Sequence, residues 1–322
     1  MKIDVLKTFQ ISELQWIDIV KGFNESFDKK TTKEILYEYA INTFCEYSYH
    51  ALAITDEGEL AGYNVFTPTL YRDNVKIVVS GSTFVRKKFR KDIFIFNDMV
   101  SALRERCVKD GFTAEVGVPN KNSKAYALKF LDMSIITDLN YYLLPITITK
   151  ILKKNIPTLI DLVLRRIFIV WSYLFFLISN VFNFNEKKVQ FEICTDNDFY
   201  NKRFHQDYYH KITKGNIRYC YRIMNEDAVK TAYIMDFREN DKRTFKSLST
   251  TVVHILHKHK VDAILFVGLL RMKQAVLFKV PKKYIPKQLT LTYYLYDVNN
   301  PKIQGIGNSD NWNFSLMNFD VR

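Results

Sequence analysis

The sequence predicts an α/β protein of two tandem domains, each with a mixed central sheet flanked by helices, joined by an apolar helical segment. A chain of 322 residues exceeds the usual size of one domain, and a hydrophobic content of 48% is ample for two cores. Strand and helix patterns alternate along the first half, and the same order recurs more faintly in the second half. A tandem repeat of one fold is the simplest interpretation.

The first half carries the clearer pattern. Two helices, at 14–27 and 32–44, precede two strands joined by the turn Asp56-Glu57-Gly58-Glu59. The predicted elements that follow are strands at 51–55, 60–67, 75–85, 114–118 and 141–148 and helices at 93–109 and 121–130.

The second half repeats this alternation with strands at 230–237, 263–267 and 289–296 and helices at 243–258 and 272–277. The polar stretch Asn183-Phe184-Asn185-Glu186-Lys187-Lys188 precedes it and reads as a turn. We therefore predict a first domain at 1–148, an apolar linker helix at 149–186 and a second, degenerate domain at 187–322.

Residues 167–184 contain no charged side chain, and Ser172, Ser179, Asn180 and Asn183 moderate their hydrophobicity. Eighteen such residues fall just short of the roughly 20 that cross a membrane. A buried or inter-domain helix is the favoured interpretation, ahead of a helix on a membrane surface and of a true span. Several cations that would suit an anionic surface precede the run: Lys150, Lys153, Lys154, Arg165 and Arg166.

The net charge of +13 favours an acidic partner, such as nucleic acid, an anionic membrane or a phosphorylated ligand. No nucleic-acid-binding motif is present, so we expect no nucleic acid partner. The N-terminus has no apolar signal segment, which predicts a cytoplasmic protein, with contact to the inner face of the membrane as the alternative that the apolar run leaves open.

Neither the cysteines nor the histidines have the spacing of a metal site. The four cysteines form no C-x-x-C pair, and His254, His257 and His259 do not share one face of a helix. We predict reduced thiols, surface histidines and no metal.

A strand running through a basic turn into a helix is the most informative local pattern. Residues 83–85 form the strand and the helix is expected to start near Ile93. Unpaired amides and the positive end of the helix dipole would meet there and suit a phosphate or pyrophosphate. Five cations surround the spot: Arg86, Lys87, Lys88, Arg90 and Lys91.

The segments 83–94, 116–123 and 130–133 resemble the GNAT family of acyl-CoA N-acyltransferases, and 307–317 looks like the tail of tandem GNAT-like proteins from bacterial surface-polysaccharide gene clusters. The resemblance implies acetyl-CoA, or another acyl-CoA, as co-substrate and an amino sugar as acceptor. It implies an N-acetyltransferase of polysaccharide biosynthesis. The alternative is a catalytically inactive GNAT-like binding or scaffolding protein of a polysaccharide assembly system.

The family's pyrophosphate motif, Arg/Gln-x-x-Gly-x-Gly/Ala, maps onto Arg90, with Ile93 and Ile95 where glycines are expected. A missing Cβ lets the backbone approach phosphate, so both isoleucines depart from the pattern. The resemblance implies a cofactor-binding set of Phe84, Val85, Arg90, Lys91, Asp92, Ile93, Phe94, Ile95, Asn120 and Ser123.

Two residues are catalytic candidates. Glu115 would act as a base if it faces the cleft; otherwise it is a solvent-facing strand carboxylate. Tyr126 would protonate the leaving thiolate, although the family's tyrosine aligns with Leu128, and a shift of two residues turns a helical side chain by about 200°.

The second half has no Arg-x-x-Gly turn, so we expect it to bind no coenzyme A. It would instead shape the acceptor pocket. Asp236 is the proposed substrate contact, with a helix cap or turn as its alternative role.

Overall fold

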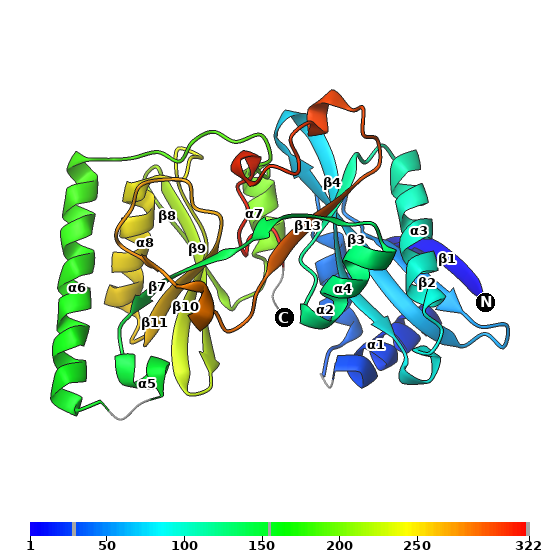
Figure 1. The fold of residues 1–322 in the computed structure, drawn as a ribbon, viewed down its shortest axis with the longest axis horizontal. Helices are drawn as coiled ribbons and strands as arrows, with labels where there is room; N and C mark the ends of the chain where they lie inside the picture. The colour runs from blue at the N-terminus through cyan, green and yellow to red at the C-terminus, as the bar shows by residue number, and fades with distance from the viewer. Residues whose placement is uncertain (28–29, 154–155, 320–322) are drawn as a thin grey trace. The chain divides into compact units, whose positions relative to one another are not determined.

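The computed structural model of the chain describes residues 1–27, 30–153 and 156–319. Two mixed sheets are present, one of seven strands in the order β1-β2-β3-β4-β5-β13-β6 and one of six in the order β12-β7-β11-β10-β9-β8 (Figure 1). Helices accompany both sheets, so the predicted α/β class with two mixed sheets is confirmed. The chain divides into two compact units, each containing one sheet.

Unit 1 contains four antiparallel strands followed by a parallel pair, β4 with β5, and then by β13, which is antiparallel to both β5 and β6. Its strands are β1 (Lys2–Lys7), β2 (Tyr49–Ile54), β3 (Leu60–Tyr71), β4 (Val75–Val85), β5 (Ala114–Gly117), β6 (Ser134–Asp138) and β13 (Thr290–Leu295). Its helices are α1 (Glu13–Phe27), α2 (Lys33–Ile41), α3 (Phe94–Lys109), α4 (Lys121–Phe130) and α7 (Asn197–Arg203).

The sheet of unit 1 is buried on both faces because helices pack on each side of it. Successive side chains of a strand point to opposite faces, so neighbouring residues of one strand enter different cores. In β2, Ala51 and Ala53 join the core beneath α3 and α4, whereas Leu52 joins the core beneath α1 and α2. Trp16 of α1 and Met99 of α3 anchor the two layers. This explains why these strands read as nearly continuous apolar runs.

Unit 2 repeats the central motif of unit 1. Its parallel pair is β10 with β11, flanked by antiparallel β9 and β7. Its strands are β7 (Asn140–Pro145), β8 (Tyr209–Lys214), β9 (Ile217–Glu226), β10 (Val229–Glu239), β11 (Ala263–Gly268) and β12 (Phe278–Lys279), and its helices α5 (Ile148–Leu152), α6 (Thr158–Val181) and α8 (Phe245–Lys258). In each unit a helix, α3 or α8, connects the two parallel strands, as such a connection requires.

The unit boundaries differ from those predicted at 148 and 186. Strand β7 follows β6 in the chain but pairs with β11, and β13 returns from the last part of the chain to lie between β5 and β6. Unit 1 therefore comprises Met1–Asp138, Phe191–Arg203 and Leu289–Asn311, and the rest belongs to unit 2. Periodicity identifies a strand but not its neighbour, and about a third of sequential strands do not pair.

Two further predictions about elements are corrected. The helix expected at 272–277 is irregular chain, because the Gln274 side chain bonds both the N–H and the C=O of Leu277. The apolar run belongs to α6, a helix of 24 residues. Only 11% of an apolar stretch of 18 residues within this helix is buried. The buried form of the favoured interpretation is therefore wrong, and the inter-domain form stays a prediction.

We predict that residues 1–148 do not fold when expressed alone. Without β13, strands β5 and β6 lack their common neighbour, and an exposed pair of strand edges promotes aggregation. Far-UV circular dichroism and chemical unfolding of the fragment should show no cooperative transition. Residues 1–138 fused by a flexible linker to 289–311 are the matched control and should recover one. A cooperative transition in the shorter fragment would contradict the assignment of β13 to this sheet.

Candidate functional site

Strands β4 and β5 part at one defined point. Their parallel pairing ends at Ser80 and Gly117, after which β4 continues to Val85. Proline at position 119 has no N–H and cannot continue a ladder, and the chain turns there toward α4. The second half of β4 thus has an edge with no strand partner in the described part of unit 1.

A β-bulge lies in β4 just beyond this parting point. Val65 of β3 pairs with Gly81 but Tyr63 pairs with Phe84, so two residues of β4 oppose one of β3. Ser82 has a φ of 48°, and the Thr83 hydroxyl donates to the side-chain oxygen of Asn64 at 2.7 Å. Bulges bend a strand and redirect its backbone groups, which here sharpens the separation from β5.

The turn after β4 contains a short 3-10 helix at Lys87–Phe89, and α3 begins at Phe94, one residue later than predicted. The first four N–H groups of a helix have no partner within it. One of them is satisfied locally, since the Phe94 N–H donates to the Asp92 carboxylate at 3.0 Å, and the backbone of Asn97 interacts with the Tyr126 hydroxyl and opposes the rise in its pKa. The amides of Ile95 and Phe96 remain for an anion.

The chain itself neutralises part of the positive charge of this turn. Arg86 is buried and its guanidinium lies 3.3 Å from Glu59 and 3.7 Å from Glu25. Lys88 also pairs with Glu59. Three exposed cations, Lys87, Arg90 and Lys91, form no ion pair with the described carboxylates. Three of the five predicted cations are thus available to a ligand.

The two isoleucines at the glycine positions have different environments. Ile95 is buried, and its side chain packs against β3, where a Cβ on Gly62 would lie 3.2 Å from Ile95 Cγ2 and 3.0 Å from Met99 Cε. Its bulk therefore points into the core. Ile93 is half exposed at the start of α3 and is the one whose side chain adds bulk near the ligand.

The predicted strand contacts and the cationic positions lie along the same edge. Phe84 is buried beneath α1, Val85 is half-buried, and Lys91 and Phe94 are exposed. Arg90 folds back on the strand, its Nε donating to the Val85 carbonyl at 2.9 Å. A guanidinium therefore covers one acceptor of the open edge of β4.

Asn120 and Ser123 lie at the start of α4. The Asn120 side-chain oxygen accepts the Ser123 N–H at 3.0 Å, a helix cap. At the other end of α4, Asp132 adopts a φ of 53°, a conformation that favours glycine. An aspartate here thus adopts a left-handed backbone conformation at the end of α4.

Tyr126 connects α4 to the start of α3. Its hydroxyl donates to the Ile93 carbonyl at 2.6 Å, and its ring lies between those of Phe96 and Phe130. Burial, followed by the charge of Asp98, raises the pKa of Tyr126. The hydroxyl thus lies at the start of α3, the part of the site predicted for pyrophosphate.

Glu115 is buried in β5, so the alternative of a solvent-facing carboxylate is wrong. Its Oε2 accepts from Arg104 Nε at 2.8 Å, and the Arg104 guanidinium lies 3.6 Å from the ring centroid of Tyr294. Burial raises the pKa of Glu115, against the opposing effects of Arg104 and a hydrogen bond from Ser80. The carboxylate would have to leave this partner to act as a base. Arg104 was not foreseen; its position eleven residues before Glu115, on the preceding helix, was the only signal.

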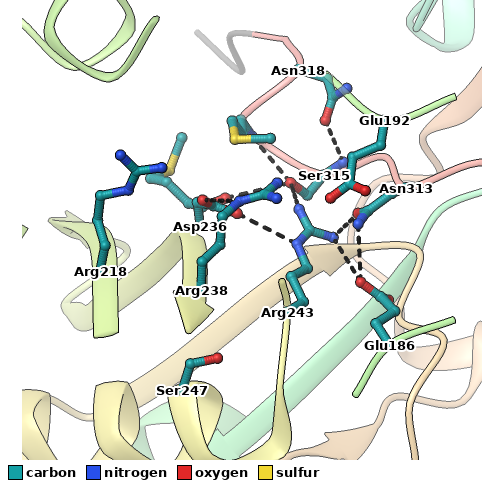
Figure 2. A network of polar contacts seen from close by, with 12 residues as sticks. Glu186, Glu192, Arg218, Asp236, Arg238, Arg243, Ser247, Asn313, Ser315 and Asn318 are labelled. Carbon is teal, nitrogen blue, oxygen red and sulfur yellow. Dashed lines mark hydrogen bonds and ion pairs between the residues drawn. The ribbon is translucent and has the colours of Figure 1, made fainter. Parts of the chain in front are cut away.

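Asp236 lies within β10 and is fully buried, neither in a turn nor at a helix cap. Its carboxylate pairs with Arg238 at 2.8 Å and with Arg243 at 3.4 Å (Figure 2). Arg243 also donates to Asn313 and to Ser315 of the C-terminal segment. These contacts place Asp236 in the core of unit 2.

The same C-terminal segment occupies the place where β10 and β11 part. Parallel pairing ends at Ile234 and Phe266, and beyond it Leu269 and Leu316 exchange backbone hydrogen bonds with Phe314 and Val267. Gly268 permits this approach, since a Cβ there would lie 2.4 Å from the Phe314 carbonyl oxygen. In unit 2 the chain itself fills the position of the open edge in unit 1.

The start of α8 is closed as well. Thr244 and Ser247 cap one another, and the Thr244 hydroxyl donates to the Glu239 carboxylate at 3.1 Å. Although burial disfavours the charge of Glu239, hydrogen bonds from Asn183 and Thr244 lower its pKa. Among the described residues no group of three or more His, Cys, Asp or Glu side chains could hold a metal ion.

No protein-family model matches the sequence, and no curated protein matches it. Several solved structures share its fold. A probable N-acyltransferase from Enterococcus faecalis superposes with a TM-score of 0.55 at 9% identity, over 94% of this chain and 74% of that one. A GCN5-related N-acetyltransferase from Anabaena variabilis gives 0.57 at 10%, over 92% and 74%, and Eis1 from Mycobacterium abscessus gives 0.52 at 11%, over 92% and 74%. At such identities the likeness concerns architecture, and the predicted tandem GNAT-like fold is confirmed.

We predict that Arg104→Met lowers the free energy of unfolding by about 3–5 kcal/mol, because it leaves the Glu115 carboxylate buried without its cation. The double variant Arg104→Met, Glu115→Gln should recover much of this loss. Arg106→Met is the matched control on the same helix, since its pair with Asp110 is half exposed and contributes about 0–1 kcal/mol. Equal losses for the two single variants in chemical unfolding would refute the role assigned to Arg104.

Proposed function

We propose that the chain is an acyl-CoA-dependent N-acyltransferase whose site lies where β4 and β5 part. The observation that carries the proposal is the unpaired edge of β4, which leads through a cationic turn to the start of α3. The resemblance of this stretch to GNAT sequences supports it. So do solved structures of the same fold that are named as N-acyl- or N-acetyltransferases.

The site offers suitable groups for each part of an acyl-CoA. Backbone groups of Phe84 and Val85 would hold the extended arm and the thioester, as an added strand would be held. The amides of Ile95 and Phe96 at the positive end of α3 would receive the pyrophosphate. Lys87, Arg90 and Lys91 would add charge-assisted hydrogen bonds.

Transfer of the acyl group requires a neutral amine held near the thioester carbonyl and donors for the developing oxyanion. A direct attack forms the amide bond and releases the thiol without a covalent intermediate on the protein. Neither Glu115 nor Tyr126 is free to assist, because each is held by a partner within unit 1. On this proposal, catalysis rests on positioning and on backbone N–H groups of β4 more than on a side-chain base.

The acceptor we propose is an amino sugar of bacterial polysaccharide biosynthesis, carried on a nucleotide or lipid phosphate. The support is the resemblance of residues 307–317 to tandem GNAT-like proteins of such gene clusters, together with the net charge of +13, which suits a phosphorylated carrier. A cytoplasmic location accords with an acyl-CoA co-substrate.

One observation favours the second candidate, an inactive GNAT-like binding or scaffolding protein. Two groups that a bound acyl-CoA would engage already have partners within the chain: the Phe94 amide holds Asp92, and the Val85 carbonyl holds Arg90. Both contacts are exposed and involve flexible side chains, so a ligand can displace them at a modest cost.

We predict that the protein binds acetyl-CoA and that Asp92→Asn tightens binding, because it removes a carboxylate from the start of α3. Arg90→Ala should weaken binding by about tenfold through the loss of a charge-assisted contact to phosphate. Lys109→Ala, at the other end of the same helix, is the matched control and should leave the affinity unchanged. Isothermal titration calorimetry measures all four proteins.

The absence of heat at high micromolar acetyl-CoA in both the unaltered chain and Asp92→Asn would exclude the transferase. Binding that appears only in Asp92→Asn would support the inactive candidate instead. Unchanged affinity in Arg90→Ala would place the pyrophosphate elsewhere.

We predict that an amino sugar releases free coenzyme A thiol from acetyl-CoA in the presence of the protein, whereas the same sugar already N-acetylated does not. Thiol release and the mass of the sugar product are the measurements. Arg90→Ala should raise the KM for acetyl-CoA more than it lowers kcat, since its contact is remote from the carbonyl. Release that does not depend on a free amine would rule out N-acylation.

A further inference from the structure

The outward side of α6 is a continuous apolar surface. At about 100° per residue, its exposed positions after Thr158 fall within roughly 160° of the helix circumference. We call these residues the outer face of α6: Leu159, Ile160, Leu162, Val163, Arg166, Ile167, Val170, Tyr173, Leu174, Leu177, Asn180 and Val181. Ten of the twelve are apolar, with Val170 66% and Leu177 62% exposed. A contiguous exposed apolar surface on a folded protein marks an interaction site.

The opposite side of α6 is fixed to unit 2. Phe168, Phe175 and Ile178 pack against the core, and α6 runs alongside α8 (Figure 1). The Ser179 hydroxyl lies 2.7 Å from that of Ser249 in α8, and the Trp171 indole N–H donates to the Ala275 carbonyl at 2.9 Å. The outer face is therefore a surface of a folded unit, held in one orientation.

The charges around the outer face are positive. Arg166 lies on it and Arg165 at its border, and neither pairs with a described carboxylate. Lys187 and Lys188 follow the helix and are exposed. Asp161, the one acidic residue of α6, is turned away and accepts the N–H groups of Ile148 and Thr149.

We propose that the outer face of α6 binds an anionic lipid surface, with the helix lying in the plane of the membrane. Apolar side chains enter the boundary between headgroups and acyl chains, while the long side chain of Arg166 reaches back to lipid phosphate. Contact with a second copy of this face is disfavoured, because it would bury Arg166 without a carboxylate. A transmembrane span would require α6 to give up its hydrogen bonds to Ser249 and Ala275.

The test is sedimentation of the full chain with vesicles. Binding is expected to vesicles of phosphatidylcholine and phosphatidylglycerol in a two-to-one ratio, to be weaker with phosphatidylcholine alone, and to be reversed by salt. The double variant Val170→Glu, Leu177→Glu should lower binding by about tenfold or more. Leu14→Glu, Ile17→Glu is the matched control, because these side chains are equally exposed on α1 of unit 1.

A Val170→Trp variant reports the depth of insertion. Its fluorescence should shift to the blue on binding and be quenched by lipids brominated near the headgroup end of their chains. Circular dichroism establishes that each variant is folded. Equal binding by the α6 variant and the α1 control would overturn the proposal, as would binding that resists both salt and alkaline carbonate, the behaviour of a span. Self-association abolished by Val170→Glu, Leu177→Glu, without vesicle binding, would assign the face to a second copy and also overturn it.

Discussion

The organisation of unit 1 depends on the short parallel pairing of β4 with β5. A parallel pair needs a crossover connection, and α3 provides it, so the start of that helix necessarily lies beyond the end of β4. The pairing covers only Ile77–Ser80 opposite Ala114–Gly117, because β5 ends before Pro119 while β4 runs on. One constraint thus produces both the open strand edge and the helix start that faces it. Strand β13 holds β5 from the other side, which fixes the position of the parting point.

Whether this architecture binds a ligand depends on a few local groups rather than on the fold. The turn carries five cations, yet Glu59 and Glu25 take up two of them. Asp92 supplies an internal anion for the helix start, and Arg90 an internal donor for the strand edge. Each is a weak, exposed contact compared with the buried pair of Glu115 and Arg104. The exposed contacts can exchange with a ligand, and the buried pair cannot do so without a large cost.

The sequence was sufficient for the α/β class, for the order of most elements and for the strand–turn–helix, because these depend on local periodicity and charge. It was insufficient wherever the answer depends on a distant residue. Ile95 stands where a glycine is expected, but its side chain packs against Gly62 on another strand and therefore points away from the ligand. Asp132 adopts a positive φ of the kind that favours glycine, and an aspartate in the sequence does not indicate this conformation. Glu115 was expected to face a cleft or solvent. Its partner Arg104 lies eleven residues earlier on another element, and nothing in the strand itself indicates this contact. The placement of β7 in the second sheet and of β13 in the first could not be predicted for the same reason, because no local pattern identifies the strand with which another strand pairs.

Comparison of the two units shows how the same motif can be opened or closed. In both, the parallel pairing ends and a bulge follows in the first of the two parallel strands. In unit 1 the edge remains unpaired and the first residue before α3, Ile93, provides no side-chain cap. In unit 2 the segment from Trp312 forms backbone hydrogen bonds with the end of β11 where β10 and β11 part, Thr244 and Ser247 cap α8, and Glu239 places a carboxylate beside them. Arg243 links that carboxylate-rich helix start to the C-terminal segment through Asn313 and Ser315, and the pairing with Asp236 keeps the guanidinium in place. An anion approaching α8 would meet satisfied amides and a negative charge, whereas one approaching α3 would meet two available amides and three cations. The asymmetry supports the proposed ligand site in unit 1 over one at the start of α8.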